Sequence, residues 1–325
     1  MTAHDDIVAL GTRIGQSIIG QEAMVERLLV GLLADGHLLV EGLPGLAKTR
    51  AIKSLAKNLD AELSRIQFTP DLLPSDITGS EVYFSEGGKG EFKFQQGPIF
   101  ASLILADEIN RAPAKVQSAL LEAMEERQVT VGGQSHPLPD LFLVMATQNP
   151  IEQEGTYPLP EAQLDRFLMH VQVGYPDEKS EAAIIRLNRA EENEAKSGGA
   201  KKPAEKLAQK AVFDARAEIG KITVSQAVEN YMVALVFATR YAAKLDPDLA
   251  KWVQVGVSPR GAIGLDRVSR AYAWLKGRDY VTPDDVKAIV HDVFRHRLIL
   301  SYEAHAGGVT ADQAIDRVVE RVAVA

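Results

Sequence analysis

Eight consecutive residues of the chain, with the sequence GLPGLAKT, combine two glycines, a lysine and a hydroxyl side chain. The apolar run before them (37–42) predicts a strand, and the amphipathic stretch after them (48–59) predicts a helix. A glycine-bearing turn between a strand and a helix aims backbone N–H groups and the positive helix end at one point, which suits a phosphate. In such a loop the lysine reaches the β- and γ-phosphates of a nucleotide and the hydroxyl coordinates Mg²⁺. The residues concerned are Gly42, Leu43, Pro44, Gly45, Leu46, Ala47, Lys48 and Thr49.

One residue of this loop departs from the general pattern G-x-x-x-x-G-K-[ST], because Ala47 replaces the glycine before the lysine. Alanine is less free than glycine at positive φ, so the replacement bears on the backbone of the loop. The competing interpretation is a turn that only caps the following helix.

A second motif, the apolar run LILADE at 103–108, ends in two acids. Alone, such a strand end is common and simply meets solvent. Downstream of a phosphate-binding loop it indicates nucleotide hydrolysis, because that reaction needs charge neutralisation and a positioned water. Asp107 is expected to help hold Mg²⁺, and Glu108 to orient and deprotonate the attacking water.

The elements that must position these residues follow from the pattern of apolar runs. Nearly continuous apolar stretches, typical of strands buried on both faces of a parallel sheet, alternate with helical patterns up to about residue 173. This alternation predicts an α/β fold. Beyond Tyr175 the strand signal disappears and helical patterns follow, with a polar stretch at 190–210. The expected strands are 37–42, 63–68, 102–108, 141–149 and 168–174.

Composition excludes several other classes of protein. The 325 residues include no cysteine, which excludes a disulfide scaffold, a cysteine–zinc site and a cysteine nucleophile. The formal net charge of −8 argues against general nucleic-acid binding. The N-terminal stretch is too polar for a signal peptide, and no apolar run approaches the ~20 residues that span a bilayer. A cytoplasmic location without membrane insertion is therefore expected.

Five motifs agree in order and context with one family. GLPGLAKT, LADEINRAP, ATQNP, LPEAQLDRF and SPRGA together resemble the MoxR family of AAA+ ATPases, whose own loop has alanine before the lysine. The resemblance implies an αβα P-loop core with a five-stranded parallel sheet, followed by an all-α lid. It also implies Mg²⁺ and ATP as the bound groups, with Ile19, Gly20 and Gln21 near the adenine.

The resemblance assigns further roles to three polar residues. Asn149 matches sensor 1, where an amide contacts the attacking water or the γ-phosphate; otherwise it caps a strand end. Arg166 matches an arginine finger that acts on the nucleotide of a neighbouring subunit. The alternative for Arg166 is an ion pair with Asp165 or Glu161.

Arg260 matches sensor 2. Ser258 is predicted as an N-cap and Pro259 as the first helical residue, which puts Arg260 in the first helical turn. A cation there opposes the helix dipole by ~0.3–1 kcal/mol, a penalty that a nearby phosphate would reverse. The alternative is a solvated surface arginine.

The predicted organisation is a nucleotide-binding core at 1–175 and a helical lid at 176–325. Two stretches of the core are predicted to form hairpins, and the resemblance implies that they are a helix-2 insert at about 69–98 and a pre-sensor-1 hairpin at about 126–140. In ring ATPases such hairpins face the pore or a partner; the alternative is a pair of surface hairpins without such a role. The nucleotide is expected where core and lid meet.

The resemblance also bears on use and partners. It implies a ring, with a hexamer expected, that remodels a client protein complex for maturation, activation or cofactor insertion. A separate protein with a von Willebrand factor A domain is the expected partner. The alternative is a nucleotide-switched binding module whose ATP occupancy controls assembly, with hydrolysis incidental.

Overall fold

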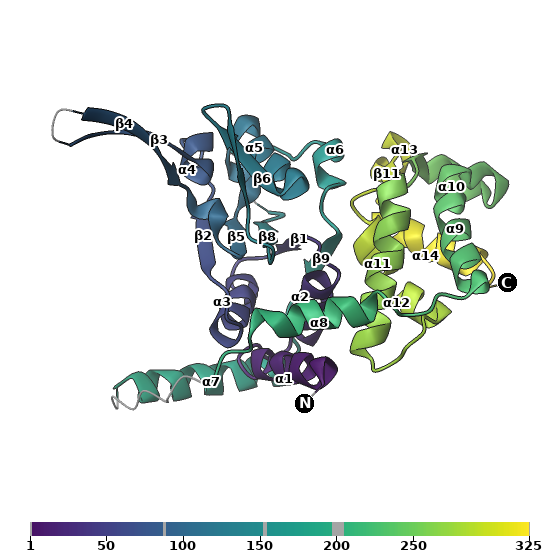
Figure 1. Ribbon diagram of the computed structural model, residues 1–325. Helices are drawn as coiled ribbons and strands as arrows, with labels where there is room; N and C mark the ends of the chain where they lie inside the picture. Colours follow the sequence, from purple (N-terminus) through teal and green to yellow (C-terminus); the bar gives the residue numbers. More distant parts are fainter. Residues whose placement is uncertain (1, 87–88, 152–154, 197–204, 325) are drawn as a thin grey trace.

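The computed structural model describes residues 2–86, 89–151, 155–196 and 205–324. Its centre is a five-stranded, all-parallel sheet (Figure 1) in the order β2-β5-β8-β1-β9. The predicted α/β fold is thereby confirmed, and each expected strand is present. The strands are β1 (Leu38–Gly42), β2 (Leu63–Gln67), β5 (Leu103–Asp107), β8 (Leu143–Gln148) and β9 (Met169–Val173).

The strands are apolar along their length because both faces of the sheet are covered. Leu38 and Val40 face one hydrophobic layer and Leu39 faces the other. The first layer includes residues of α1 (Ala3–Gly15), α2 (Glu22–Leu33), α3 (Lys48–Asn58) and α8 (Gln209–Ile219). The second includes residues of α4 (Pro74–Thr78) and α5 (Ala114–Glu126).

Two hairpins interrupt the core. The strands β3 (Gly79–Glu86) and β4 (Lys89–Gln96) form a ribbon that projects far from the sheet, and its tip lies outside the described residues (Figure 1). The second hairpin joins β6 (Gln128–Val131) to β7 (Gln134–Pro137). Its turn glycines, Gly132 and Gly133, both have positive φ (58° and 80°), which a tight two-residue hairpin turn requires.

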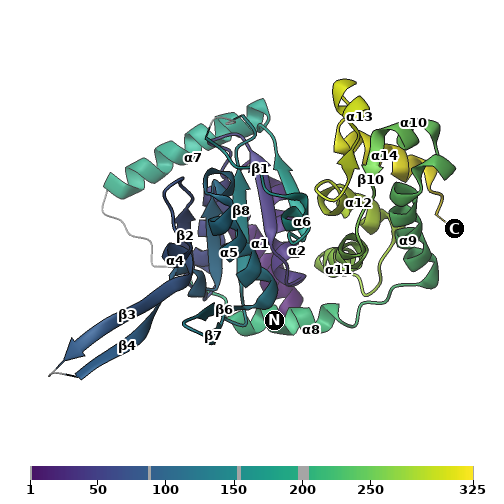
Figure 2. The same ribbon diagram turned by 90° about the horizontal axis from the view of Figure 1, so that it is seen from above.

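The C-terminal region is a helical bundle that stands beside the β9 edge of the sheet. Figure 2 shows it on the side of the molecule away from the β3–β4 ribbon and from α7 (Glu178–Lys196). The short helix α6 (Glu161–Leu164) precedes β9. The bundle helices are α9 (Gln226–Arg240), α10 (Pro247–Trp252), α11 (Pro259–Leu275), α12 (Pro283–Phe294), α13 (Tyr302–Ala306) and α14 (Ala311–Arg321).

Two details differ from the prediction for this half. Strands do occur after Tyr175: β10 (Val253–Val255) pairs antiparallel with β11 (Ile299–Leu300). Segments of three and two residues are too short for a periodic pattern to reveal. The expected polar loop at 190–210 overlaps α7, which continues to Lys196; residues 197–204 lie outside the description.

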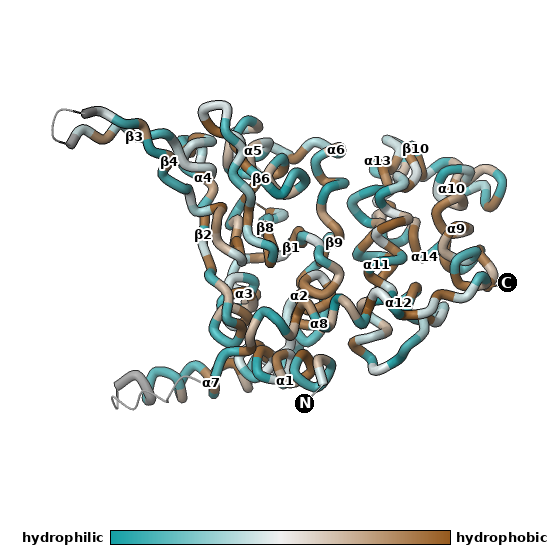
Figure 3. Tube along the Cα trace, viewed as in Figure 1, coloured by the Kyte–Doolittle hydropathy of each residue, from teal (hydrophilic) through white to brown (hydrophobic). Residues whose placement is uncertain are grey.

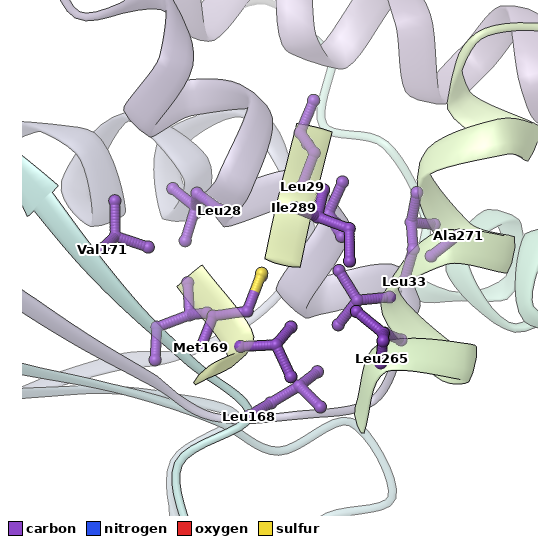
Figure 4. Close-up of a cluster of buried hydrophobic side chains, with 14 of the residues drawn as sticks. Leu28, Leu29, Leu33, Leu168, Met169, Val171, Leu265, Ala271 and Ile289 are labelled. Atoms are coloured by element: carbon purple, nitrogen blue, oxygen red, sulfur yellow. The ribbon is translucent and has the colours of Figure 1, made fainter. Parts of the chain in front are cut away.

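Core and bundle share one continuous hydrophobic cluster (Figure 4). Leu28, Leu29 and Leu33 of α2 pack beside Leu168, Met169 and Val171 and beside Leu265, Ala271 and Ile289 of the bundle. Figure 3 shows hydrophobic residues along the sheet and on the inner helices, whereas α7 is hydrophilic along most of its length. Among the described residues, no helix is long and apolar enough to cross a membrane.

Candidate nucleotide site

The phosphate-binding loop turns out of β1 and into α3, which begins at Lys48. Gly45 has a φ of 85°, and a Cβ atom on Gly42 would lie 2.8 Å from the carbonyl oxygen of Val173. Both glycines are therefore required. Ala47 itself adopts the left-handed region, with φ 58° and ψ 11°, at a cost of about 1 kcal/mol. The loop thus reaches its turn with alanine in place of glycine.

The lysine of the loop lies over the carboxyl ends of two strands. Lys48 Nζ donates hydrogen bonds to the carbonyl oxygen of Gly42, at the end of β1, and to that of Gln148 (3.0 Å), at the end of β8. The ammonium group is therefore held at the mouth of the loop, where a phosphate would approach the first turn of α3.

The two acids at the end of β5 are organised by one threonine on the neighbouring strand. Thr147 Oγ1 donates to Asp107 Oδ1 at 2.7 Å and accepts from the backbone N–H of Glu108 at 3.0 Å. Asp107 also pairs with Arg65 of β2, whose Nη2 lies 2.7 Å from Oδ2. The Thr147 hydroxyl thus fixes the carboxylate of Asp107 and the backbone of Glu108.

Glu108 has a strained backbone, with φ 58° and ψ 51°. Its carboxylate accepts a hydrogen bond from Gln67 Nε2 (2.9 Å) and pairs with Arg111 Nε (3.1 Å). Backbone strain at a carboxylate facing a cavity is a feature of functional sites. Two polar neighbours thus hold this carboxylate at the end of the sheet.

These groups open into one cavity of about 890 Å³, which we call the P-loop cavity. Its polar end carries the loop, both acids and Asn149, whose Oδ1 accepts from the N–H of Ile151 at 3.3 Å. Its apolar end is built from isoleucines, which suit the flat face of a base. The residues that define the cavity for this argument are Ile18, Ile19, Pro44, Gly45, Leu46, Ala47, Lys48, Thr49, Asp107, Glu108, Thr147, Asn149, Ile184, Ile185 and Asn188.

The N-terminal segment expected near the adenine divides into two parts. Ile19 lines the P-loop cavity, whereas Gly20 and Gln21 lie outside its lining. Gln21 Nε2 donates to the carbonyl oxygen of Gly174 (2.8 Å), and Gly20, at φ 75°, packs closely against Pro176. These two residues anchor the segment that carries Ile19.

The two remaining predicted residues lie elsewhere. Arg166 and Arg260 line a second cavity of about 300 Å³, where five arginines meet three carboxylates. Both pair with Glu125 at the end of α5, Arg166 through Nε at 2.8 Å. We call this the arginine cavity; it is lined by Asp35, His37, Glu125, Arg127, Asp165, Arg166, Arg260, Arg267 and Arg297, among others.

The local predictions for these arginines need two corrections. Arg166 pairs with Glu125 and not with Asp165 or Glu161. Ser258 does occupy the N-cap position of α11, but its Oγ donates to both carboxylate oxygens of Asp165 (2.9 Å each) and makes no capping bond. The hydroxyl donates instead to an ionised carboxylate, which is a charge-assisted hydrogen bond.

The chemistry of the donors in the P-loop cavity fits a magnesium nucleotide. Among the described residues, no cluster of three or more His, Cys, Asp or Glu side chains could hold a metal ion by itself. Mg²⁺ characteristically uses one or two protein oxygens together with phosphates and water. Thr49 and Asp107 supply such oxygens beside the loop.

Several residues in or beside the two cavities escaped prediction. Thr147 and Gln67 end strands beside β5, and only the strand order shows that they meet the acids. Ile184 and Ile185 belong to no motif. They lie on α7, which only the tertiary structure places beside the P-loop cavity. Glu125 belongs to no motif either. Its contacts are with Arg166 and Arg260, which are distant from it in the sequence.

A P-loop between β1 and α3, paired acids at the end of β5 and an appended helical bundle define a P-loop ATPase with a lid. Known families match both parts: the "ATPase family associated with various cellular activities (AAA)" over residues 37–169 and the "AAA lid domain" over 250–318. None of the residues that line the P-loop cavity falls in the second range.

Relatives extend the match to nearly the whole chain. It is 48% identical to the Chaperone MoxR1 of Mycobacterium tuberculosis, over 94% of this chain and 79% of that protein. It is 31% identical to the Protein MoxR of Methylorubrum extorquens, over 92% and 90% of the two chains. A solved structure from Cytophaga hutchinsonii superposes with a TM-score of 0.89, at 44% identity, over 99% and 96%. The chain belongs to the MoxR family of AAA+ ATPases.

Proposed function

We propose that the protein hydrolyses Mg²⁺-ATP and uses the cycle to remodel a client protein complex, as a ring of identical subunits. The observation that carries the proposal is the meeting, in one cavity, of a phosphate-binding loop with two acids tied to a single threonine. This arrangement supplies a place for phosphates, an oxygen ligand for a cation and a base for water.

Each residue has a distinct part in the proposed reaction. The loop N–H groups and Lys48 bind the β- and γ-phosphates, while Thr49 and Asp107 hold the cation. When bound, Mg²⁺ neutralises charge on the phosphate oxygens. Glu108 orients a water molecule and accepts its proton, and Asn149 donates to that water or to the γ-phosphate.

The location of Arg166 and Arg260 supports action between subunits. Both line the arginine cavity and lie outside the P-loop cavity of their own chain. Their side chains are partly exposed to solvent, Arg166 by 29% and Arg260 by 47%. An arginine from one subunit can then stabilise the charge that develops on the nucleotide of the next. Repetition of such a head-to-tail contact closes a ring, and we propose a hexamer.

The proposed use rests on the family. One relative is named a chaperone, which supports a role in the maturation, activation or cofactor loading of a client protein complex. We propose that a separate protein with a von Willebrand factor A domain connects the ATPase to that client.

A Glu108→Gln substitution tests the proposal. It should abolish hydrolysis while leaving ATP bound, because the amide keeps the size of the side chain but cannot accept the proton. Glu126→Gln, which changes an exposed glutamate on α5, is the matched control. Proteins retained on the ATP-bound variant are then identified, and activation of a retained client is measured. Client activation that persists without hydrolysis would favour the nucleotide-switched binding module.

A further inference from the structure

One arginine of the bundle has every donor satisfied inside the protein. Arg297 lies in the turn after α12 with only 3% of its side chain exposed. Its Nε donates to Asp165 Oδ1 (2.7 Å). Its Nη1 donates to the carbonyl oxygens of Leu168 (3.1 Å) and Val293 (2.6 Å), and its Nη2 to those of Asp165 (3.0 Å) and Phe167 (2.6 Å). A guanidinium has five N–H donors, and all five are used.

Four of these five bonds end on residues 165, 167 and 168, which flank Arg166 on both sides. Only the bond to Val293 stays within the bundle. The contacts therefore hold the backbone of the turn that carries Arg166 and do not involve the side chain of Arg166. The Arg166 side chain meets Glu125 and does not contact Arg297 in any of these bonds.

Neighbouring side chains of the bundle also bind the segment around Arg166. His296 Nε2 lies 2.9 Å from the carbonyl oxygen of Phe167, and Ser258 Oγ donates to Asp165. Arg295 donates to the carbonyl oxygen of His170, the second residue of β9. Polar side chains of the bundle thus fix the 165–170 segment of the core, each through a hydrogen bond to the main chain or to Asp165.

The choice of arginine at 297 has a geometric basis. Desolvation lowers its pKa, and the carboxylate of Asp165 counteracts this effect. A guanidinium stays charged when buried and presents its donors in a rigid planar fork. A lysine carries the same charge but only three donors on a flexible stem, so it cannot span the carbonyl groups on both sides of Arg166.

We propose that Arg297 is a positioning residue for Arg166, and that the bundle thereby sets where the finger arginine enters the neighbouring subunit's site. This inference rests on the proposed action of Arg166 between subunits. A purely structural clamp would make the same bonds, so the test must separate the delivery of Arg166 from stability.

Mixed oligomers make that separation. Subunits with Arg166→Ala keep an intact loop, and subunits with Lys48→Ala keep an intact Arg166; each is expected to be inactive alone. Mixed, they should hydrolyse ATP wherever a Lys48→Ala subunit supplies Arg166 to an Arg166→Ala subunit. Arg297→Lys is then placed in one partner or in the other, and the rate of hydrolysis is measured.

The proposal expects an asymmetric loss. Arg297→Lys in the subunit that supplies Arg166 should lower the rate about 10- to 100-fold, as a misplacement of about 1 Å does. The same substitution in the other subunit, whose finger is already absent, should change the rate less than about two-fold. Arg270→Lys is the matched control, since Arg270 pairs with Asp266 within α11, and it should show no asymmetry.

Other results would overturn the inference. Equal losses in both partners indicate a structural clamp, and no loss in either removes the role. A parent pair that shows no complementation would refute the action of Arg166 between subunits, and this inference with it. Thermal unfolding of each variant checks folding. If Arg297→Lys does not fold, Ser258→Ala, which removes the contacts of the hydroxyl with both carboxylate oxygens of Asp165, repeats the test with an expected loss of about two- to five-fold.

Discussion

The P-loop cavity and the arginine cavity are built by different means. In the first, the polar groups stand at the ends of parallel strands or in the turn that follows one, so adjacent strands bring them together. In the second, side chains from α5, from the turn before β9 and from the bundle meet only when the whole chain has folded. The polar end of the first cavity comes from the ends of adjacent strands and the turns that follow them, whereas the second cavity depends on the placement of the bundle.

The charges of the two cavities differ as well. The arginines outnumber the carboxylates in the arginine cavity, and its histidine, His37, is buried and neutral. The P-loop cavity balances Lys48 and other cations against its acids. An excess of cations suits a cavity that receives phosphate from outside the chain.

The largest effects should separate binding from hydrolysis. Arg166→Ala should lower the rate of ATP hydrolysis about 10³-fold or more, and leave nucleotide affinity within a few-fold, because the proposed role of the arginine is mainly to stabilise a neighbour's transition state. Lys48→Ala should instead remove nucleotide binding. Steady-state kinetics and nucleotide titration measure both, with Arg270→Ala on α11 as the control arginine. Equal loss of binding in the two variants would contradict a division of labour between the cavities.

Lowering the pH should destabilise the folded protein through the buried histidines in and near the arginine cavity. Burial lowers the pKa of His37 to about 3, and burial with the charge of Arg297 lowers that of His296 well below its usual value. Both histidines take up protons near pH 6.5 only when unfolded, so their stabilising effect is complete above that pH and is lost as the pH falls. From about pH 7.5 to about pH 5, the protonation of His37 should reduce the free energy of unfolding by about 2 kcal/mol, and that of His296 should reduce it further.

Denaturant titrations at the two pH values measure this loss. His296→Gln keeps a donor for the carbonyl oxygen of Phe167 but cannot titrate in this range. The variant should therefore lose less stability on acidification than the parent. An unchanged pH dependence would show that His296 is not a source of the acid sensitivity.

A smaller effect should come from Glu125, which pairs with both exposed arginines. Glu125→Gln removes the charge that competes with an incoming phosphate, so the Michaelis constant for ATP should fall about two- to five-fold. Glu126→Gln, one residue further along α5, controls for the loss of a surface charge. A rise of similar size would mean that Glu125 serves mainly to hold the arginines in place.

The smallest effect concerns the P-loop cavity. Ala47→Gly relieves the left-handed strain but gives the unfolded chain more freedom, so the free energy of unfolding should change by less than about 1 kcal/mol. Nucleotide affinity should stay within about two-fold. Ala51→Gly, inside α3, should cost about 1 kcal/mol or more, because its backbone is helical and its side chain is buried. A large gain in affinity for Ala47→Gly would show that the alanine restrains the loop.

The contrast also explains what the sequence could predict. The strands, the loop and the acids are encoded by local patterns, and so is the first turn of α11 that carries Arg260. The meeting of Arg166, Arg260 and Glu125 depends on tertiary placement, which no spacing in the chain reveals. The capping role expected of Ser258 gave way to Asp165 for the same reason. The boundary near Tyr175 remains a prediction; α8, beyond it, packs on α1 and α2 of the core.

The hydrogen bonds between the bundle and the 165–170 segment have a consequence for solubility. β9 ends the sheet, and a terminal strand offers unpaired carbonyl groups that can recruit a strand from another molecule. Arg295 and Arg297 occupy the carbonyl groups of His170 and Leu168 along this edge. The same side chains that orient the turn before β9 therefore shield the sheet from edge-to-edge aggregation.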